Sequence, residues 1–203
     1  MTALPRLLVL TDRTQTGGRP LLEVLRAAAD GGARAVLVRE KDLSGVERDA
    51  LVEALRPYVE VLLVAAGPTG RPALDRVDGV HLAARDPLPT CRPRLLGRSC
   101  HDADELRRAG LEGCDYVTVS PVFPSPSKPG YGPPVTLAGL RALAGGSTVP
   151  VFALGGVTAE RAAACVDAGA HGVAVMGAVM RAPDPAGVVA ALVEAVDDTG
   201  GPR

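Results

Sequence analysis

His101 is the residue of this chain best suited to proton transfer. It follows the run LLGRS (95–99) and directly precedes Asp102. A histidine can donate and accept protons near neutral pH, so His101 is a candidate general acid and base. The alternative is a helix-entry residue without a chemical role. His81 lies inside an apolar run and is expected to be structural, and His171 is expected at the surface.

Two positive charges follow another apolar run. Arg39 and Lys41 flank Glu40, and side chains alternate along an extended strand. Arg39 and Lys41 should therefore point to the same side, where two cations suit a diphosphate or a carboxylate. The alternative is a solvated strand end in which Glu40 pairs with these cations.

The segment SPVFPSPSKPGYGPP (120–134) contains six prolines, which exclude a helix or a central strand. Prolines hold a loop in shape at low entropic cost. Ser125, Ser127 and Lys128 would then offer two hydroxyls and a positive charge to an anionic, phosphorylated substrate. The alternative is an ordinary long loop, although ordered loops of this length are usually functional.

Glycines follow two further apolar runs. Gly155 and Gly156 come after VFAL, and Met176 and Gly177 come after GVAV. Glycine lets backbone N–H groups approach a ligand, so these positions are candidates for binding phosphate. The alternative is that they only form turns and helix caps.

The elements that must position these residues repeat about every 25 residues. Most of the β-type runs are apolar throughout, which is typical of parallel strands covered on both faces. The runs are 7–11, 35–40, 61–65, 79–82, 95–99, 116–120, 151–155 and 172–176.

Helix-like stretches lie between most of these runs. They span 20–32, 44–58, 102–113, 136–146, 158–169 and 184–196, with candidate N-caps at Asp102, Thr136, Thr158 and Asp184. Helices in 66–78 and 83–94 are poorly marked. The pattern predicts one (β/α)8 TIM-barrel domain over 1–203, with a frayed tail at 195–203. A doubly wound open sheet is the structural alternative.

Composition excludes several classes of function. Of 203 residues, 47% are hydrophobic and 2% aromatic, and the net charge is −1, so neither nucleic acid nor a membrane surface is an expected partner. The four cysteines form no C-x-x-C pair, which gives no support to a zinc or redox site. The N-terminal apolar run is too short for a signal peptide, so a cytoplasmic location is expected. Homo-oligomerisation stays open.

Seven segments in register resemble the thiamine phosphate synthase and thiazole tautomerase family. They are LTD (10–12), REK (39–41), DGVHL (78–82) with Asp86, GRSCH (97–101), DYVTVSPVFPSPSK (115–128), VFALGG (151–156) and GVAVMGAV (172–179). The resemblance implies a thiazole phosphate bound at the ends of strands 7 and 8. It also implies one of two activities.

The synthase joins a pyrimidine methyl diphosphate to a thiazole phosphate with Mg²⁺. By resemblance, Arg39, Lys41, Ser99 and Lys128 would neutralise the diphosphate, and Asp86 would bind Mg²⁺. The sequence departs from the synthase pattern at three positions. Leu37 replaces a glutamine that reads the pyrimidine, and Ala66 and Gly67 replace an Asn-Asp pair. Ala and Gly offer no side-chain ligand to a hard cation.

The tautomerase aromatises a thiazole carboxylate phosphate by moving a proton, without a cofactor. GRSCHD resembles the G-R-S-x-H segment of that branch, which makes His101 the general acid and base. On this ground we expect the tautomerase, with the synthase as the alternative. A non-catalytic phosphate-ligand binder or pathway regulator is a third possibility. Whether 65–70 moves as a lid is left open by the sequence.

Overall fold

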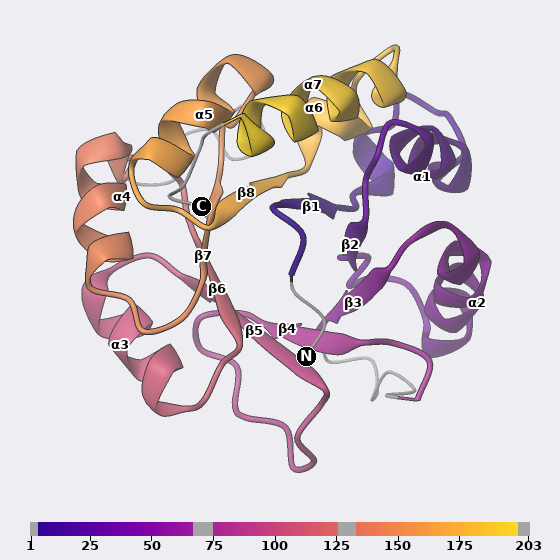
Figure 1. Ribbon diagram of the computed structural model, residues 1–203. Helices are drawn as coiled ribbons and strands as arrows, with labels where there is room; N and C mark the ends of the chain where they lie inside the picture. The colour runs from indigo at the N-terminus through magenta and orange to yellow at the C-terminus, as the bar shows by residue number, and fades with distance from the viewer. Residues whose placement is uncertain (1–3, 67–74, 126–132, 199–203) are drawn as a thin grey trace.

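Eight parallel strands close into a barrel in the computed structural model, which describes residues 4–66, 75–125 and 133–198 (Figure 1). The strands are β1 (Leu7–Leu10), β2 (Ala35–Val38), β3 (Val61–Ala65), β4 (Gly79–Leu82), β5 (Leu95–Cys100), β6 (Tyr116–Val119), β7 (Val151–Leu154) and β8 (Gly172–Val175). Each pairs with the next, and β8 pairs with β1. This closure confirms the predicted (β/α)8 fold over the open sheet.

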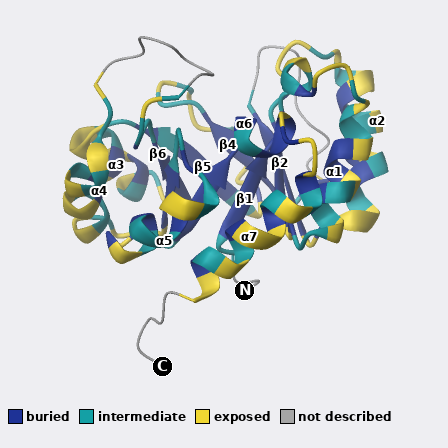
Figure 2. Cartoon of the chain, turned by 90° about the horizontal axis from the view of Figure 1, so that it is seen from above, coloured by how far each residue is buried: buried dark blue, intermediate teal, exposed yellow. Residues whose placement is uncertain are grey.

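The unbroken apolar runs arise because both faces of every strand are covered. One face fills the barrel with residues such as Leu8, Leu37 and Leu63, each at most 2% exposed. The other face packs under the helices, and Figure 2 shows the buried strands ringed by helices whose exposed faces point outward.

The helices follow the predicted stretches closely. They are α1 (Leu21–Asp30), α2 (Gly45–Leu55), α3 (Ala103–Leu111), α4 (Thr136–Gly145), α5 (Ala159–Asp167), α6 (Gly177–Met180) and α7 (Pro185–Asp197), with 3-10 turns η1 (Arg13–Gln15) and η2 (Arg56–Tyr58). The short α6 was not predicted. Helix α7 continues to Asp197, past the predicted start of the tail at residue 195, and residues 199–203 of that tail lie outside the described residues. Among the described helices, none combines the length and apolar character needed to cross a membrane.

Two of the predicted N-caps form as expected. Asp102 Oδ1 accepts from Glu105 N at 2.8 Å, and Asp184 Oδ1 accepts from Gly187 N at 3.0 Å. Helix α4 begins at Thr136 with Val135 in the N-cap position, so that predicted cap is one residue late. Thr158 is the N-cap of α5 but makes no side-chain capping bond.

No helix joins β4 to β5, although the repeat called for one in 83–94. Pro87, Pro89 and Pro93 explain this, because proline removes a helical donor and clashes with the preceding turn. The buried side chain of Arg98 replaces the missing helix as a support. Its Nη1 donates to the carbonyls of Ala83, Ala84 and Asp86 at 2.9–3.1 Å.

The guanidinium of Arg98 also needs a counter-charge, because the side chain is completely buried. Its Nη2 lies 2.7 Å from Glu112 Oε2, as an ion contact without hydrogen-bond alignment. Strand β5 therefore carries a buried cation on its outer face that fixes the β4–β5 connection.

Gly97 in β5 leaves space for the side chain of Tyr116 inside the barrel. A Cβ built on Gly97 would overlap the ring of Tyr116. The Tyr116 ring in turn packs edge-to-face on Phe152, with centroids 5.7 Å apart. These two rings fill part of the barrel interior, where the other buried side chains are mainly Leu, Ala and Val.

We predict that Gly97→Ala destabilises the fold by about 1–3 kcal/mol, because the added methyl overpacks a filled core. Urea denaturation measures the change. Gly145→Ala is the matched control, since a Cβ at this last residue of α4 meets nothing within 4 Å. A Gly97→Ala protein as stable as the control would contradict the packing role of Gly97.

Candidate functional site

A cavity of about 1250 Å³ opens at the carboxyl ends of the barrel strands. Most of the predicted site residues line it: Arg39, Lys41, Ser99, His101, Ser125, Gly155, Gly156, Met176 and Gly177. Asp86 is absent from its lining, and Ser127 and Lys128 lie outside the described residues. The barrel geometry thus gathers residues from distant parts of the chain around one space.

Arg13 pairs with two carboxylates that neighbour Arg39 and Lys41 in the chain. Its backbone N and its Nη1 bind the Glu40 carboxylate at 3.1 and 3.0 Å. Its Nη2 binds Asp42 at 2.7 Å, a hydrogen bond that holds the pKa of Asp42 at about 2. The side chain of Glu40 is 3% exposed and pairs with Arg13. The alternative, in which Glu40 pairs with Arg39 and Lys41, is therefore not what the structure shows.

Arg39 and Lys41 consequently have no ion-pair partner among the described residues. Arg39 is anchored through its backbone, whose N donates to Thr11 Oγ1 at 2.9 Å. Both side chains line the cavity, as the alternation along the strand predicted. They form one cationic wall of the site.

Gly155 and Gly156 are required by local packing. Their φ angles are +97° and +63°, a region that favours glycine. A Cβ on Gly155 would lie 2.9 Å from Pro121, and one on Gly156 would lie 2.5 Å from the Pro124 carbonyl. The proline-rich segment therefore crosses directly over these glycines, and Phe123 N donates to Gly155 O at 3.0 Å.

Two arginines that sequence reasoning missed flank the glycines. Arg161 donates to the Gly156 carbonyl at 2.8 Å, and its guanidinium lies 4.9 Å from the centre of the Phe123 ring. Arg181 lies so close to Gly177 that a Cβ there would collide with its guanidinium. Both line the cavity, and their closeness to the glycines in sequence was the available signal.

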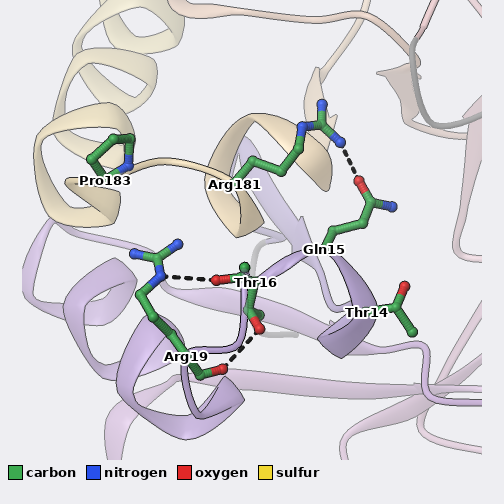
Figure 3. A pocket seen from close by; sticks show the side chains of 7 residues that line it. Thr14, Gln15, Thr16, Arg19, Arg181 and Pro183 are labelled. Atoms are coloured by element: carbon green, nitrogen blue, oxygen red, sulfur yellow. Dashed lines mark hydrogen bonds between the residues drawn. The ribbon is translucent and has the colours of Figure 1, made fainter.

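Arg181 also borders a second hollow of about 770 Å³, lined by Thr14, Gln15, Thr16, Gly17, Arg19, Arg181 and Pro183 (Figure 3). Figure 3 shows the Arg181 guanidinium reaching the side-chain oxygen of Gln15. Gln15 Nε2 in turn donates to Asp12 at 2.6 Å. This chain of contacts ties the β8 end of the cavity to the turn that follows β1.

His101 is oriented by a carboxylate. Its Nδ1 lies 2.9 Å from Glu105 Oε2, and its backbone N donates to the same oxygen at 2.8 Å. Since a carboxylate oxygen accepts, Nδ1 is the donor in this contact. The backbone N of Glu105 donates to the Asp102 cap, while its carboxylate turns to His101. The spacing of four residues between His101 and Glu105 was the sequence signal for this contact, and it was missed.

His81 is part of the cavity wall, beyond the structural role predicted for it. Its Nε2 lies 2.9 Å from Ser99 Oγ, and its Nδ1 lies 3.1 Å from the Tyr116 hydroxyl. Burial, together with the charges of Lys41 and Arg98, lowers the pKa of His81 to about 3. His81 is therefore neutral at physiological pH. His171, expected at the surface, is half-buried against Phe152.

The described residues do not fit a magnesium ion held by the protein. Asp86 Oδ2 accepts from Ala83 N at 2.8 Å, so this carboxylate closes its own turn. Ala66 has no side-chain oxygen, and Gly67 lies outside the described residues. Over 4–66, 75–125 and 133–198, no group of three His, Cys, Asp or Glu side chains could hold a metal. Leu37 adds an apolar surface to the cavity floor.

The buried neutral state of His81 makes stability sensitive to acid. Between about pH 6.5 and pH 3 the unfolded chain protonates His81 and the folded chain does not, so acidification favours unfolding. This one group should cost about 2 kcal/mol between pH 7 and pH 5, at about 1.4 kcal/mol per pH unit.

Urea denaturation at the two pH values, compared between the wild type and His81→Gln, measures this cost. We expect the variant to lose about 2 kcal/mol less than the wild type on acidification, whatever its stability at pH 7. Equal losses in the two proteins would show that His81 protonates in the folded state.

Comparison with known proteins agrees with this geometry. The family model described as thiamine monophosphate synthase matches residues 7–179. The thiamine-phosphate synthase of Roseiflexus castenholzii is 39% identical over 196 residues, covering 92% of this chain and 86% of that protein. The one from Moorella thermoacetica is 37% identical, covering 89% and 90%.

Among solved structures, a thiamine phosphate pyrophosphorylase from Pyrococcus furiosus superposes with a TM-score of 0.81 at 27% identity, covering 97% of each chain. A geranylgeranylglyceryl phosphate synthase from Thermoplasma acidophilum, at 14% identity and a TM-score of 0.67, shares the barrel fold. The family match and the relatives cover nearly the whole length of this chain. The chain therefore belongs to the thiamine monophosphate synthase family, whose members are enzymes of thiamine biosynthesis.

Proposed function

We propose that this chain is a thiamine-phosphate synthase. In this reaction a bond forms between the methylene carbon of a pyrimidine methyl diphosphate and a thiazole phosphate, and the carbon–oxygen bond to the diphosphate breaks. The curated relatives named above all carry this activity in their names. They favour the synthase over the tautomerase that the GRSCHD segment led us to expect.

The observation that carries the proposal is a set of four cationic side chains around one cavity. Arg39 and Lys41 follow β2, and Arg161 and Arg181 flank the glycines that follow β7 and β8. Two phosphorylated substrates bring two anionic groups, and each pair of cations suits one of them. The volume of about 1250 Å³ exceeds that of common single-ligand pockets.

The diphosphate gains negative charge as it leaves. Preorganised cations stabilise such charge without reorganisation at the moment of reaction. Arg39 and Lys41 are suited to this role because Arg13 occupies the carboxylates of Glu40 and Asp42, their neighbours in the chain. Since the described residues form no magnesium site, we derive no step through a metal held by the protein.

The tautomerase remains a second candidate because of the contact between His101 and Glu105. A carboxylate that fixes the imidazole tautomer is an arrangement suited to proton transfer. The apolar Leu37, where the synthase pattern has a glutamine, fits this candidate as well.

Formation of thiamine phosphate from both half-substrates, read as fluorescent thiochrome after oxidation, tests the synthase. We expect turnover by the wild type and a loss of roughly tenfold to hundredfold in Arg39→Ala and Lys41→Ala, because each removes a charged contact to the diphosphate. Arg34→Ala is the control, since Arg34 pairs with Glu60 on the exposed surface. No product from the wild type, with a control synthase active in parallel, would overturn the proposal.

His101→Gln separates the two candidates. A synthase should keep its rate of thiamine phosphate formation within about threefold, because the transfer does not depend on His101. A tautomerase should lose about 10²–10⁴-fold in aromatisation of the thiazole carboxylate phosphate. Calorimetric binding of thiazole phosphate without either turnover would instead indicate a binding protein.

A further inference from the structure

We propose that Tyr116, His81 and Ser99 form a hydrogen-bond chain with one fixed direction, which makes Ser99 a hydrogen-bond donor to a phosphate oxygen of the bound substrate. His81 and Tyr116 are positioning residues in this arrangement. The identity of the substrate as a diphosphate rests on the proposed function. The direction of the hydrogen-bond chain does not rest on the proposed function.

The chain crosses three neighbouring strands at one level of the barrel. His81 of β4 pairs in register with Gly97 of β5, and Gly97 pairs with Tyr116 of β6. Because Gly97 has no side chain, the Tyr116 ring reaches across β5 to His81, and the two rings stack with centroids 5.5 Å apart. Ser99 lies two residues further along β5, at the cavity.

Each polar atom of the His81 ring has a partner, so the protons can be assigned. His81 is 6% exposed and neutral, and carries one N–H. Burial raises the pKa of Tyr116, so its phenol keeps its proton. If the phenol donates to Nδ1, then Nε2–H donates to Ser99 Oγ, and the protons of Tyr116 and His81 both have acceptors.

The opposite direction leaves one proton without an acceptor. With the proton on Nδ1, the imidazole would donate to the Tyr116 oxygen, and the phenolic proton would have no acceptor in the part of the chain that the structure describes. An unsatisfied buried donor disfavours this tautomer by about tenfold or more. The geometry therefore selects the Nε2–H tautomer.

The Nε2–H tautomer of His81 fixes the role of the Ser99 hydroxyl. Its oxygen accepts from His81, so its own O–H is left to donate into the cavity. Lys41 lies close enough to oppose protonation of His81, and it lines the same cavity. A hydroxyl donor beside an ammonium calls for an anionic oxygen, as in a phosphate or diphosphate.

The imidazole nitrogen shifts of ¹⁵N-histidine-labelled protein test the direction at pH 7. The chain contains only three histidines, so His81 is assigned by the signal that His81→Gln removes. We expect His81 in the Nε2–H form in the wild type and in the control Tyr58→Phe, whose ring lies at the surface. In Tyr116→Phe the Nδ1 nitrogen loses its donor, so its resonance should move to higher frequency while the Nε2–H form persists, because the Ser99 acceptor is retained. A wild-type His81 with its proton on Nδ1, or with two protons, would overturn the proposal.

Binding of inorganic diphosphate, measured by calorimetry, tests the donor role without requiring catalysis. Ser99→Ala should weaken binding by about tenfold, and Tyr58→Phe should not. Unchanged affinity in Ser99→Ala would overturn the donor role. A wild type that forms no thiamine phosphate but shows the expected tautomer and affinities would refute the proposed function and support this inference.

Discussion

The missing side chain at Gly97 is the constraint on which the upper part of the barrel depends. Any Cβ there would displace Tyr116, whose ring plugs the barrel together with Phe152. The same space lets Tyr116 meet His81, and His81 in turn contacts Ser99 at the cavity. One glycine therefore links core packing to the polar groups of the site. Both demands fall on a position where only the smallest residue fits.

Much of the fold and the outline of the site followed from the sequence. Apolar runs at a regular spacing predicted the barrel, and the barrel brought Arg39, Lys41, Ser99 and His101 to one rim. The failures arose where side-chain direction decides the role. Arg98 lies next to Ser99, but its side chain points to the outer face of β5 and binds carbonyls. No local pattern distinguishes a buried structural arginine from a ligand-binding one.

Charge pairing explains why the cavity is suited to anions although the whole chain is nearly neutral. Arg13 occupies Glu40 and Asp42, and Arg98 occupies Glu112, so these carboxylates are compensated away from the cavity. Arg39 and Lys41 line the cavity without a salt bridge to any described carboxylate. A local excess of positive charge results from the arrangement of pairs and cannot be read from the net charge of −1.

The same charge pattern bears on how the diphosphate is handled. A site that relies on Mg²⁺ needs carboxylate or carbonyl oxygens at the ligand, but Asp86 closes its own turn and Ala66 offers no side-chain oxygen. In the proposed reaction, Arg39 and Lys41 would bind diphosphate oxygens directly. Charge neutralisation would then fall to guanidinium and ammonium groups. Because a tautomerase has no leaving diphosphate, the proposed transfer accounts better than aromatisation for these two cations in addition to those beside the glycines.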